Sequence, residues 1–408
     1  MTESVKKVEV DQLVPGMYIH DLNCEWIDHP FWRNRFLIRD QGTISKIAER
    51  GIREVYIDTA RGTDLPQAPT LSEVVRDTER KVVSLAELRQ NEVRQVSLDE
   101  ERRRATRIYD DARVTVRQVM QDARLGQQVE LERVDPVIEK MMDSVFRHVD
   151  ALVPLARLKS HDNYTFDRAV ANAVLMIAFA RNLELDRDTT RDIALGALLQ
   201  DVGMVRVPGD ILAKPGRLTD TEYRVMQSHV ETGQWLLAEV DGVPERALEV
   251  VTQHHERYDG TGYPNHLRGE AISLFAQMGA IADVYDALTS NRPYQQATAP
   301  TVALRKLYEW SSHHFNPTLV QGFIRTVGIY PVGSLVRLEN GRLGIVLEQH
   351  QDNLLRPKLR IMYDTRKQSY MRPYDIDLAY NPPLGHERIV APESFARWGI
   401  DPARWRLT

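Results

Sequence analysis

The spacing of hydrophobic positions divides the chain into a short mixed segment, a long helical region and a final β segment. Over residues 1–62, runs such as VEVDQLVPGMYIHDL predict strands around a turn at Pro15-Gly16. The run TISKIAERGIREVYID predicts a helix that ends at Gly51 and is followed by a strand. We therefore expect a small α+β domain over residues 1–62.

Residues 63–158 have no strand-like alternation. The stretch RGTDLPQAPTLSE is rich in Pro, Thr and Gly and predicts a linker. After it, apolar residues recur at helical spacing among many charges, so long helices are expected. The basic run Arg102-Arg103-Arg104 has two interpretations, a nucleic-acid contact or the solvated face of a long helix, and such runs more often form a solvated face. Because long amphipathic helices often pair between subunits, we expect a homodimer.

Between residues 159 and 328 almost every segment has helical periodicity. Successive helices are predicted in AVANAVLMIAFARNL, TTRDIALGALL, TDTEYRVMQSHVETGQWLLAEV, PERALEVVTQHHERY, LFAQMGAIADVYDALT and TVALRKLYEWSSHH. From residue 329 the period changes to two, and Asn340-Gly341 predicts a hairpin turn between LVRLE and RLGIVLE. The predicted fold class is mainly α: an all-α domain over 159–328, with a small β appendage and tail over 329–408.

Composition narrows the class of protein. Of 408 residues, 42% are hydrophobic and 27% are charged, as in ordinary soluble globular proteins. The net charge of −5 argues against general nucleic-acid affinity, although a local basic patch can still hold a small phosphate ligand. The single Cys24 excludes an internal disulfide framework and is typical of a reducing cytosol. The sequence has no apolar run of membrane-spanning length and no signal-peptide pattern, so we expect a cytoplasmic protein without a membrane segment.

Several polar residues occupy helical positions where the periodicity predicts burial. A lone histidine on an apolar helix is more often a hydrogen-bonded core residue than a ligand, and an isolated aspartate can cap a turn or pair with an arginine. Such groups on successive helices of one domain are harder to explain in this way. Imidazole nitrogens and carboxylate oxygens together are ligands of Zn, Fe or Mn, and buried carboxylates need positive charge nearby. The predicted metal ligands are Asp201, His229, His254, His255 and Asp283.

The most specific segment is HHERYDGTGYP, residues 254–264. Two adjacent histidines on a helix diverge by about 100°, so both can line one pocket only from different sides. Glu256 is expected beside them, the glycines after Asp259 allow a tight turn, and Tyr263-Pro264 stiffens its exit. Backbone N–H groups and an aromatic ring at such a turn suit a phosphate and a base. A plain helix–loop–helix turn would explain the glycines but not the two histidines.

Together with the later ADVYDALTSNRPY, this segment resembles the HD-GYP family, a branch of the HD superfamily of metal-dependent phosphohydrolases. The resemblance is dense from about residue 160 to 325 and includes VPGDILAKPGRLTDTEYRVMQSHVETG. The N-terminal residues are similar to the small domain of unknown function that precedes many HD-GYP domains. The resemblance implies an all-α catalytic domain with two or three metal ions. It also implies hydrolysis of the bacterial second messenger cyclic di-GMP to the linear dinucleotide or to GMP.

Three positions depart from the family's motif. Where the family usually has the first histidine, the histidine of the HD pair and the lysine after it, this sequence has Arg168, Gln200 and Met204. The resemblance implies that one metal is held by the two lost histidines, Asp201 and Asp283. It implies that the other is held by Asp201, as the bridging and catalytic carboxylate, and by three later histidines that are all present. We therefore expect one divalent ion, Fe, Mn or Zn, rather than two, or none.

Arg168 cannot donate a lone pair to a metal, because its guanidinium stays protonated. It could instead neutralise Asp201 and Asp283 in place of the missing cation, or hold a phosphate bidentately. The resemblance implies contacts with the nucleotide from the RPY motif. The predicted substrate-binding residues are Arg292 and Tyr294 of RPY, Tyr263 of GYP, and Arg168.

These departures bear directly on activity. Two-metal hydrolysis uses one ion to make a hydroxide and both ions to stabilise the displacement. With one ion, and with Met204 in place of the lysine, we predict that hydrolysis of cyclic di-GMP is weak or absent. The alternative is a non-enzymatic module on the same fold that senses the cyclic or linear dinucleotide or binds proteins such as diguanylate cyclases. A third hypothesis is a hydrolase of another phosphoester.

Overall fold

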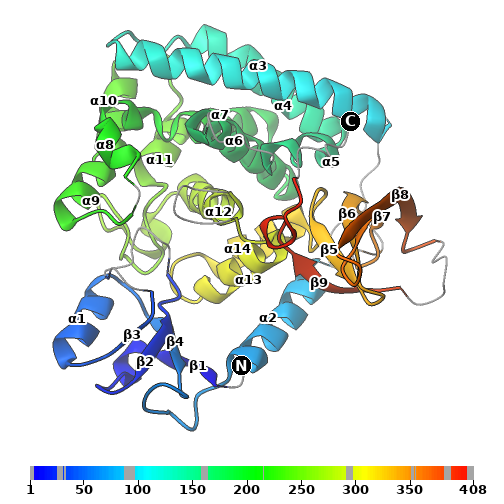
Figure 1. Cartoon of the computed structure of the whole chain (residues 1–408). Helices are drawn as coiled ribbons and strands as arrows, with labels where there is room; N and C mark the ends of the chain where they lie inside the picture. The colour runs from blue at the N-terminus through cyan, green and yellow to red at the C-terminus, as the bar shows by residue number, and fades with distance from the viewer. Residues whose placement is uncertain are drawn as a thin grey trace. The chain divides into compact units, whose positions relative to one another are not determined.

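The computed structural model describes residues 4–24, 31, 34–86, 97–157, 164–214, 216–290, 297–350, 353, 355–380 and 387–401. The chain divides into two compact units, of which the first comprises Met1–Lys81 with Asp210–Arg224 and the second Val82–Gly209 with Val225–Thr408. The first unit contains the small α+β fold. The second contains the helical domain and the C-terminal sheet (Figure 1).

The first unit is built on a four-stranded antiparallel sheet in the order β1-β4-β2-β3. Helix α1 begins after Asp40, whose carboxylate accepts the N–H of Thr43 at 2.8 Å, and the chain leaves the helix through Gly51, which has a φ of 71°. Ile19 of the sheet and Ile47 of the helix belong to one buried core. The α+β fold expected here is confirmed. The elements are β1 (Val5–Glu9), η1 (Val10–Gln12), β2 (Tyr18–Asp21), β3 (Phe36–Leu37), α1 (Gln41–Glu49) and β4 (Glu54–Asp58).

The second unit is mainly helical, as predicted. In Figure 1, α6, α7 and α12 lie between the long helix α3 and the pair α13 and α14. Helices α6 and α12 are apolar on nearly all sides, which is typical of helices buried at a domain centre. The helices are α3 (Leu98–Arg124), α4 (Leu131–Arg147), α5 (Val149–Leu152), α6 (Tyr164–Asn182), α7 (Arg187–Leu199), α10 (His229–Ala238), α11 (Glu245–Gln253), α12 (Leu274–Thr289), α13 (Pro300–Trp310) and α14 (Pro317–Val327).

Several shorter or peripheral helices complete the chain. None of the helices in the described ranges is long and apolar enough to cross a membrane. Arg103 and Arg104 are exposed on α3, and Arg104 pairs with Glu100 at 2.6 Å, so these two residues of the basic run lie on a solvated helix face. Arg102 is half-buried and donates to the carbonyl of Leu347. The remaining helices are α2 (Leu71–Ala86), η3 (Leu155–Arg157), η5 (Val202–Arg206), α8 (Gly209–Leu212), α9 (Asp220–Gln227), η6 (Gly269–Ala271) and η7 (Ala396–Trp398).

Two helix predictions near the site were wrong in detail. The run TDTEYRVMQSHVETGQWLLAEV forms two helices, α9 and α10, rather than one. They separate at Ser228, whose hydroxyl donates to the carbonyl of Val225 at 2.8 Å and so competes with the helical ladder. Helix α11 ends at Gln253, so His254 caps it and His255 follows in the turn. The two histidines therefore approach the site from a helix end and not from one continuous helix face.

The C-terminal segment forms a five-stranded antiparallel sheet in the order β8-β7-β6-β5-β9. The hairpin predicted at Asn340-Gly341 is present between β5 and β6, with a φ of 83° at Gly341. The Asn340 side chain accepts the N–H of Arg342 at 2.9 Å, which fixes the turn. The strands are β5 (Leu335–Leu338), β6 (Arg342–Glu348), β7 (Lys358–Asp364), β8 (Ser369–Asp377) and β9 (Ile389–Glu393).

Candidate metal site

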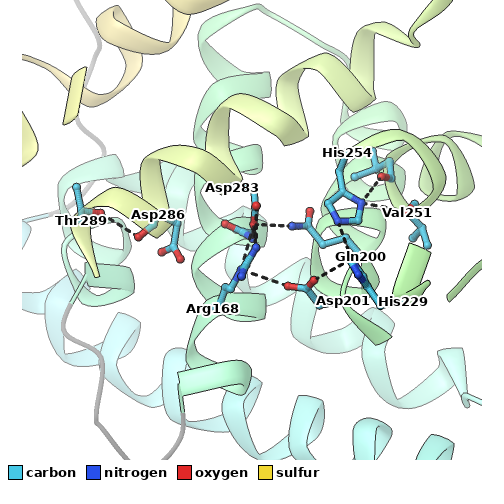
Figure 2. Close-up of polar contacts among 11 residues, drawn as sticks. Arg168, Gln200, Asp201, His229, Val251, His254, Asp283, Asp286 and Thr289 are labelled. Carbon is cyan, nitrogen blue, oxygen red and sulfur yellow. Dashed lines mark hydrogen bonds and ion pairs between the residues drawn. The ribbon is translucent and has the colours of Figure 1, made fainter. Parts of the chain in front are cut away.

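Four potential metal ligands converge at the ends of three helical segments in the second unit. One donor atom from each residue lies within 4.8 Å of the donor atoms of the other three. Three of the four residues, Asp201, His229 and His254, are labelled in Figure 2. The mixture of imidazole nitrogens and a carboxylate oxygen at this spacing suits one Zn, Fe or Mn ion. We call these residues the four-donor group: Asp201 after α7, His229 at the start of α10, and His254 and His255 after α11.

Hydrogen bonds to the backbone set the orientation of two of these histidines. The Nδ1 atom of His229 lies 2.7 Å from the carbonyl of Met226, and Nδ1 of His254 lies 3.0 Å from that of Val251. A carbonyl can only accept, so each Nδ1 carries a proton and Nε2 is the nitrogen that can bind a metal ion. The two Nε2 atoms face each other at 3.5 Å. Two lone pairs at that distance repel unless a cation lies beside both, so the donors fit a metal ion.

Burial favours the neutral form of two of these imidazoles, those of His229 and His255. His229 is fully buried, and this burial lowers its pKa to about 4. Burial, and next the neighbouring His254, lower the pKa of His255 well below its ordinary value. Neutral imidazole is the form that binds metals, so protons do not compete for these nitrogens near neutral pH.

Asp201 divides its two carboxylate oxygens between different neighbours. Its Oδ1 lies 3.6 Å from Nε2 of His229 and, within the described part of the chain, accepts no hydrogen bond although it is buried. Its Oδ2 lies 3.2 Å from Nε of Arg168. A buried carboxylate oxygen without a donor is costly, and a metal ion at the four-donor group would satisfy it.

Glycines allow the close packing that brings these residues together. A Cβ at Gly203 would lie 1.9 Å from the carbonyl oxygen of His229, so the segment after Asp201 rests directly on the first turn of α10. A Cβ at Gly262 would lie 2.5 Å from the carbonyl oxygen of His255. Tyr263 follows, donates its N–H to that oxygen at 3.1 Å, and stacks on the His255 ring with centroids 4.7 Å apart.

A second buried cluster lies beside Asp201, and we call it the arginine centre. The Nη2 atom of Arg168 donates to both carboxylate oxygens of Asp283 at 2.7 Å. Asn172 and Gln200 also donate side-chain N–H groups to Oδ1 of Asp283, at 2.8 and 2.9 Å. Burial alone would raise the pKa of Asp283, but the Arg168 guanidinium, the neighbouring His254 and the hydrogen bonds from Arg168 and Asn172 lower it to about 2. The arginine centre comprises Arg168, Asn172, Gln200 and Asp283.

Comparison with known proteins identifies the family. Parts of the chain match models of a domain of unknown function (residues 5–134), an HD domain (residues 141–319) and a KOW domain associated with HD domains (residues 335–397). A cyclic di-GMP phosphodiesterase of Pseudomonas aeruginosa is 40% identical over 397 residues, which are 97% of this chain and 94% of the relative. The chain belongs to the HD-GYP family.

Other relatives of this HD-GYP protein match shorter stretches. A cyclic di-GMP phosphodiesterase response regulator of Xanthomonas campestris is 42% identical over 36% of this chain and 39% of the relative. A 3'3'-cGAMP-specific phosphodiesterase of Vibrio cholerae is 40% identical over 30% of this chain and 24% of the relative. The relatives are thus named for activity on two different cyclic dinucleotides.

The structure does not bring all of the predicted site residues to one point. Asp283 lies outside the four-donor group and bonds to Arg168 instead. Glu256, expected beside the histidines, accepts the N–H groups of Asn265 and Leu267 at 2.7 and 3.0 Å and so holds the turn that follows. Arg292 and Tyr294 lie outside the described residues.

Sequence reasoning missed Asn172. It lies four residues after Arg168 in the otherwise apolar run AVANAVLMIAF, so it faces the same side of α6 as the arginine. A polar residue at that spacing from a charged one is the signal that could have revealed it. Its donation to Asp283 shows that the arginine centre is more than one ion pair.

The two clusters can do different chemistry. A divalent ion at the four-donor group would supply Lewis acidity and lower the pKa of a coordinated water. Asp201 would orient that ion through Oδ1 while Oδ2 faces Arg168. Arg168 holds a fixed positive charge next to the site but cannot lower the pKa of a bound water as a metal does.

Proposed function

We propose that this HD-GYP protein acts in cyclic di-GMP signalling, binds a single divalent ion, and hydrolyses the nucleotide weakly or not at all. The observation that carries the proposal is the position of Arg168. Its guanidinium contacts Asp201 at 3.2 Å and Asp283 at 2.7 Å, the two carboxylates that the resemblance assigns to the first metal. A fixed cation therefore stands between the carboxylates in place of that ion.

The protein's own residues account for the expected loss of rate. Both ions of a two-metal site stabilise the attacking and leaving oxygens, and one of them activates the water. The guanidinium can neutralise charge on a phosphate but supplies no Lewis acid. Met204, in η5 after Asp201, has no charge to offer where the family has a lysine. Asp201 keeps the role of the catalytic carboxylate only towards the ion of the four-donor group.

Cyclic di-GMP is the proposed ligand, because the relative that is similar over nearly the whole chain is named for it. The aromatic ring of Tyr263, stacked on His255, and the guanidinium of Arg168 are proposed to contact the nucleotide. Contacts from Arg292 and Tyr294 remain predictions. The homodimer and the association with diguanylate cyclases are predictions of the same kind.

A non-enzymatic sensor of the cyclic or linear dinucleotide is the second candidate. The hydrogen bonds to Asp283 support this candidate. Its carboxylate already accepts N–H groups from Arg168, Asn172 and Gln200, so few of its lone pairs are left to bind a second ion. The sensor and the weak enzyme share the single-ion site and differ only in turnover.

Metal content and turnover, measured on the same purified full-length protein, test the proposal. We expect one Fe, Mn or Zn per chain, tight binding of cyclic di-GMP, and much slower hydrolysis than in a variant carrying Arg168→His, Gln200→His and Met204→Lys. That variant should also hold a second ion. Two ions in the unaltered protein with rapid turnover would contradict the single-ion site. An ion-free protein that still binds the nucleotide would favour the sensor over the enzyme.

A further inference from the structure

Gln200 presents a buried carbonyl oxygen for which the described part of the chain supplies no donor. Its side chain is 1% exposed, and its Nε2 donates to Oδ1 of Asp283 at 2.9 Å. Its Oε1 accepts no hydrogen bond among the described residues. Figure 2 shows Gln200 between Asp283 and His254, at the boundary between the arginine centre and the four-donor group.

The orientation of this amide is fixed by chemistry. Asp283 is held by Arg168 as a carboxylate, which can only accept hydrogen bonds. The amide nitrogen of Gln200 must therefore point towards Asp283, and its oxygen must point away from it. A flipped amide would set the carbonyl against the carboxylate, which excludes that arrangement.

The backbone turns the N–H groups of two neighbouring histidines away from this oxygen. His229 and His254 donate from Nδ1 to backbone carbonyls, and their Nε2 atoms face each other in the four-donor group. Asp201 contributes a carboxylate, which accepts. Among the described residues no N–H or O–H bonds to the Gln200 oxygen, and a water molecule between Gln200 and the four-donor group would satisfy it.

We propose that Gln200 is a positioning residue whose carbonyl accepts a hydrogen bond from a water molecule that shares the four-donor group with the metal ion. This rests on the single-ion site of the proposed function. Asp283 holds the amide nitrogen, so the carbonyl is preoriented and directs one hydrogen of the water. At position 200 the family has a histidine that binds the first metal. In this chain Gln200 would instead orient a water molecule at the ion of the four-donor group.

Titration of the metal-free full-length protein with Mn²⁺ alone tests this role. Gln200→Leu removes the acceptor and should weaken Mn²⁺ binding roughly tenfold, as loss of an outer hydrogen bond to a metal site does. Asn172→Leu is the matched control, because it removes a donor to the same Oδ1 of Asp283 and should change the affinity less than about twofold. Gln200→Glu keeps an acceptor, and the O–H of its acid form can donate to Asp283 where Gln200 donates an N–H, so this variant should bind Mn²⁺ at least as tightly as the unaltered protein.

A spectroscopic measurement separates water orientation from general support of the site. Electron–nuclear double resonance of bound Mn²⁺ in H₂O and D₂O reports the exchangeable protons of a coordinated water. We expect their couplings to change in Gln200→Leu and to stay unchanged in Asn172→Leu.

Three results would overturn the inference. They are unchanged Mn²⁺ affinity in Gln200→Leu, equal weakening in Gln200→Leu and Asn172→Leu, and equal weakening in Gln200→Leu and Gln200→Glu. If Gln200→Leu does not fold, Gln200→Glu still decides, because weaker Mn²⁺ binding in that variant contradicts the acceptor role. Failure of the unaltered protein to bind Mn²⁺ would instead remove the single-ion site itself, and with it this role.

Discussion

The four-donor group and the arginine centre share Asp201 as a neighbour but handle buried charge in opposite ways. In the four-donor group, imidazole nitrogens and one carboxylate oxygen lie within 4.8 Å of one another, and Oδ1 of Asp201 accepts no hydrogen bond among the described residues. In the arginine centre the cation belongs to the chain, and Asp283 accepts N–H groups from three side chains. The carboxylate of Asp201 thus needs an ion at Oδ1, whereas the carboxylate of Asp283 is satisfied by the chain itself.

The comparison shows how two neighbouring clusters can be built independently. Arg168 carries a charge of the same sign as a metal ion, so it neutralises Asp283. Gln200 donates a further N–H to that carboxylate. His229 and His254 lie on other elements and are oriented by backbone carbonyls, so Arg168 makes none of the contacts that orient them.

The largest expected effect comes from removing the internal cation. Arg168→Met leaves Asp283 buried without its main partner and should lower the free energy of unfolding by about 3–5 kcal/mol. Urea unfolding at pH 7 in metal-free buffer measures it. The control is Arg187→Met, because Arg187 is 51% exposed and its pairs with Glu139 and Asp143 should contribute at most about 1 kcal/mol. Equal losses of unfolding free energy in the two variants would show that the buried ion pair of Arg168 contributes no more than an exposed one.

The contributions of the two clusters to the stability of the folded protein should also be lost in separate pH ranges. The pKa of His229 is about 4 in the folded protein against an ordinary value of 6.5, so the unfolded chain binds its proton first as pH falls. Stability should therefore drop by about 3 kcal/mol between pH 6.5 and 4 in the metal-free protein. Asp283, with a pKa of about 2 against an ordinary value of 3.8, should contribute a further loss of about 2 kcal/mol between those values.

Unfolding free energies of the metal-free protein from pH 8 down to pH 2 separate these contributions. A His229→Gln variant should lose much of the slope between pH 6.5 and 4, with the rest attributable to His255. The Arg168→Met variant should keep that slope and should approach the unaltered protein in stability below pH 4, where Asp283 can take up a proton. A slope that is the same in all three proteins would contradict the assignment.

A smaller loss of stability is expected when the backbone packing around the four-donor group is disturbed and its ligand side chains are left unchanged. Because a Cβ at Gly203 would lie 1.9 Å from the His229 carbonyl oxygen and 2.6 Å from the N of Gly233, Gly203→Ala must shift α10. We expect a loss of about 2 kcal/mol and weaker Mn²⁺ binding by roughly tenfold or more. Gly209→Ala, where no atom lies within 4 Å of the added Cβ, should leave both quantities unchanged.

The sequence predicted the mixed segment, the helical region and the C-terminal hairpin, which follow from periodicity and turn residues, and these are local properties. The contact of Arg168 with Asp201 and Asp283 was one of two roles considered for that residue, and it depended on the family resemblance. The break at Ser228 and the end of α11 before His254 were missed, because a side chain competing for a carbonyl does not alter the hydrophobic pattern. The role of Gly203 was missed because it depends on two distant segments touching.

The smallest effect separates the two clusters most cleanly. Asn172→Leu removes one N–H group from Oδ1 of Asp283, but Arg168 and Gln200 still donate to that atom, so the expected loss is about 1 kcal/mol. The same variant should bind Mn²⁺ as the unaltered protein does, because Asn172 is not among the four donors. A loss of stability without a loss of metal affinity would show that the arginine centre stabilises the fold independently of the ion. A parallel loss of both would mean that the two clusters form one cooperative unit, joined through Asp201.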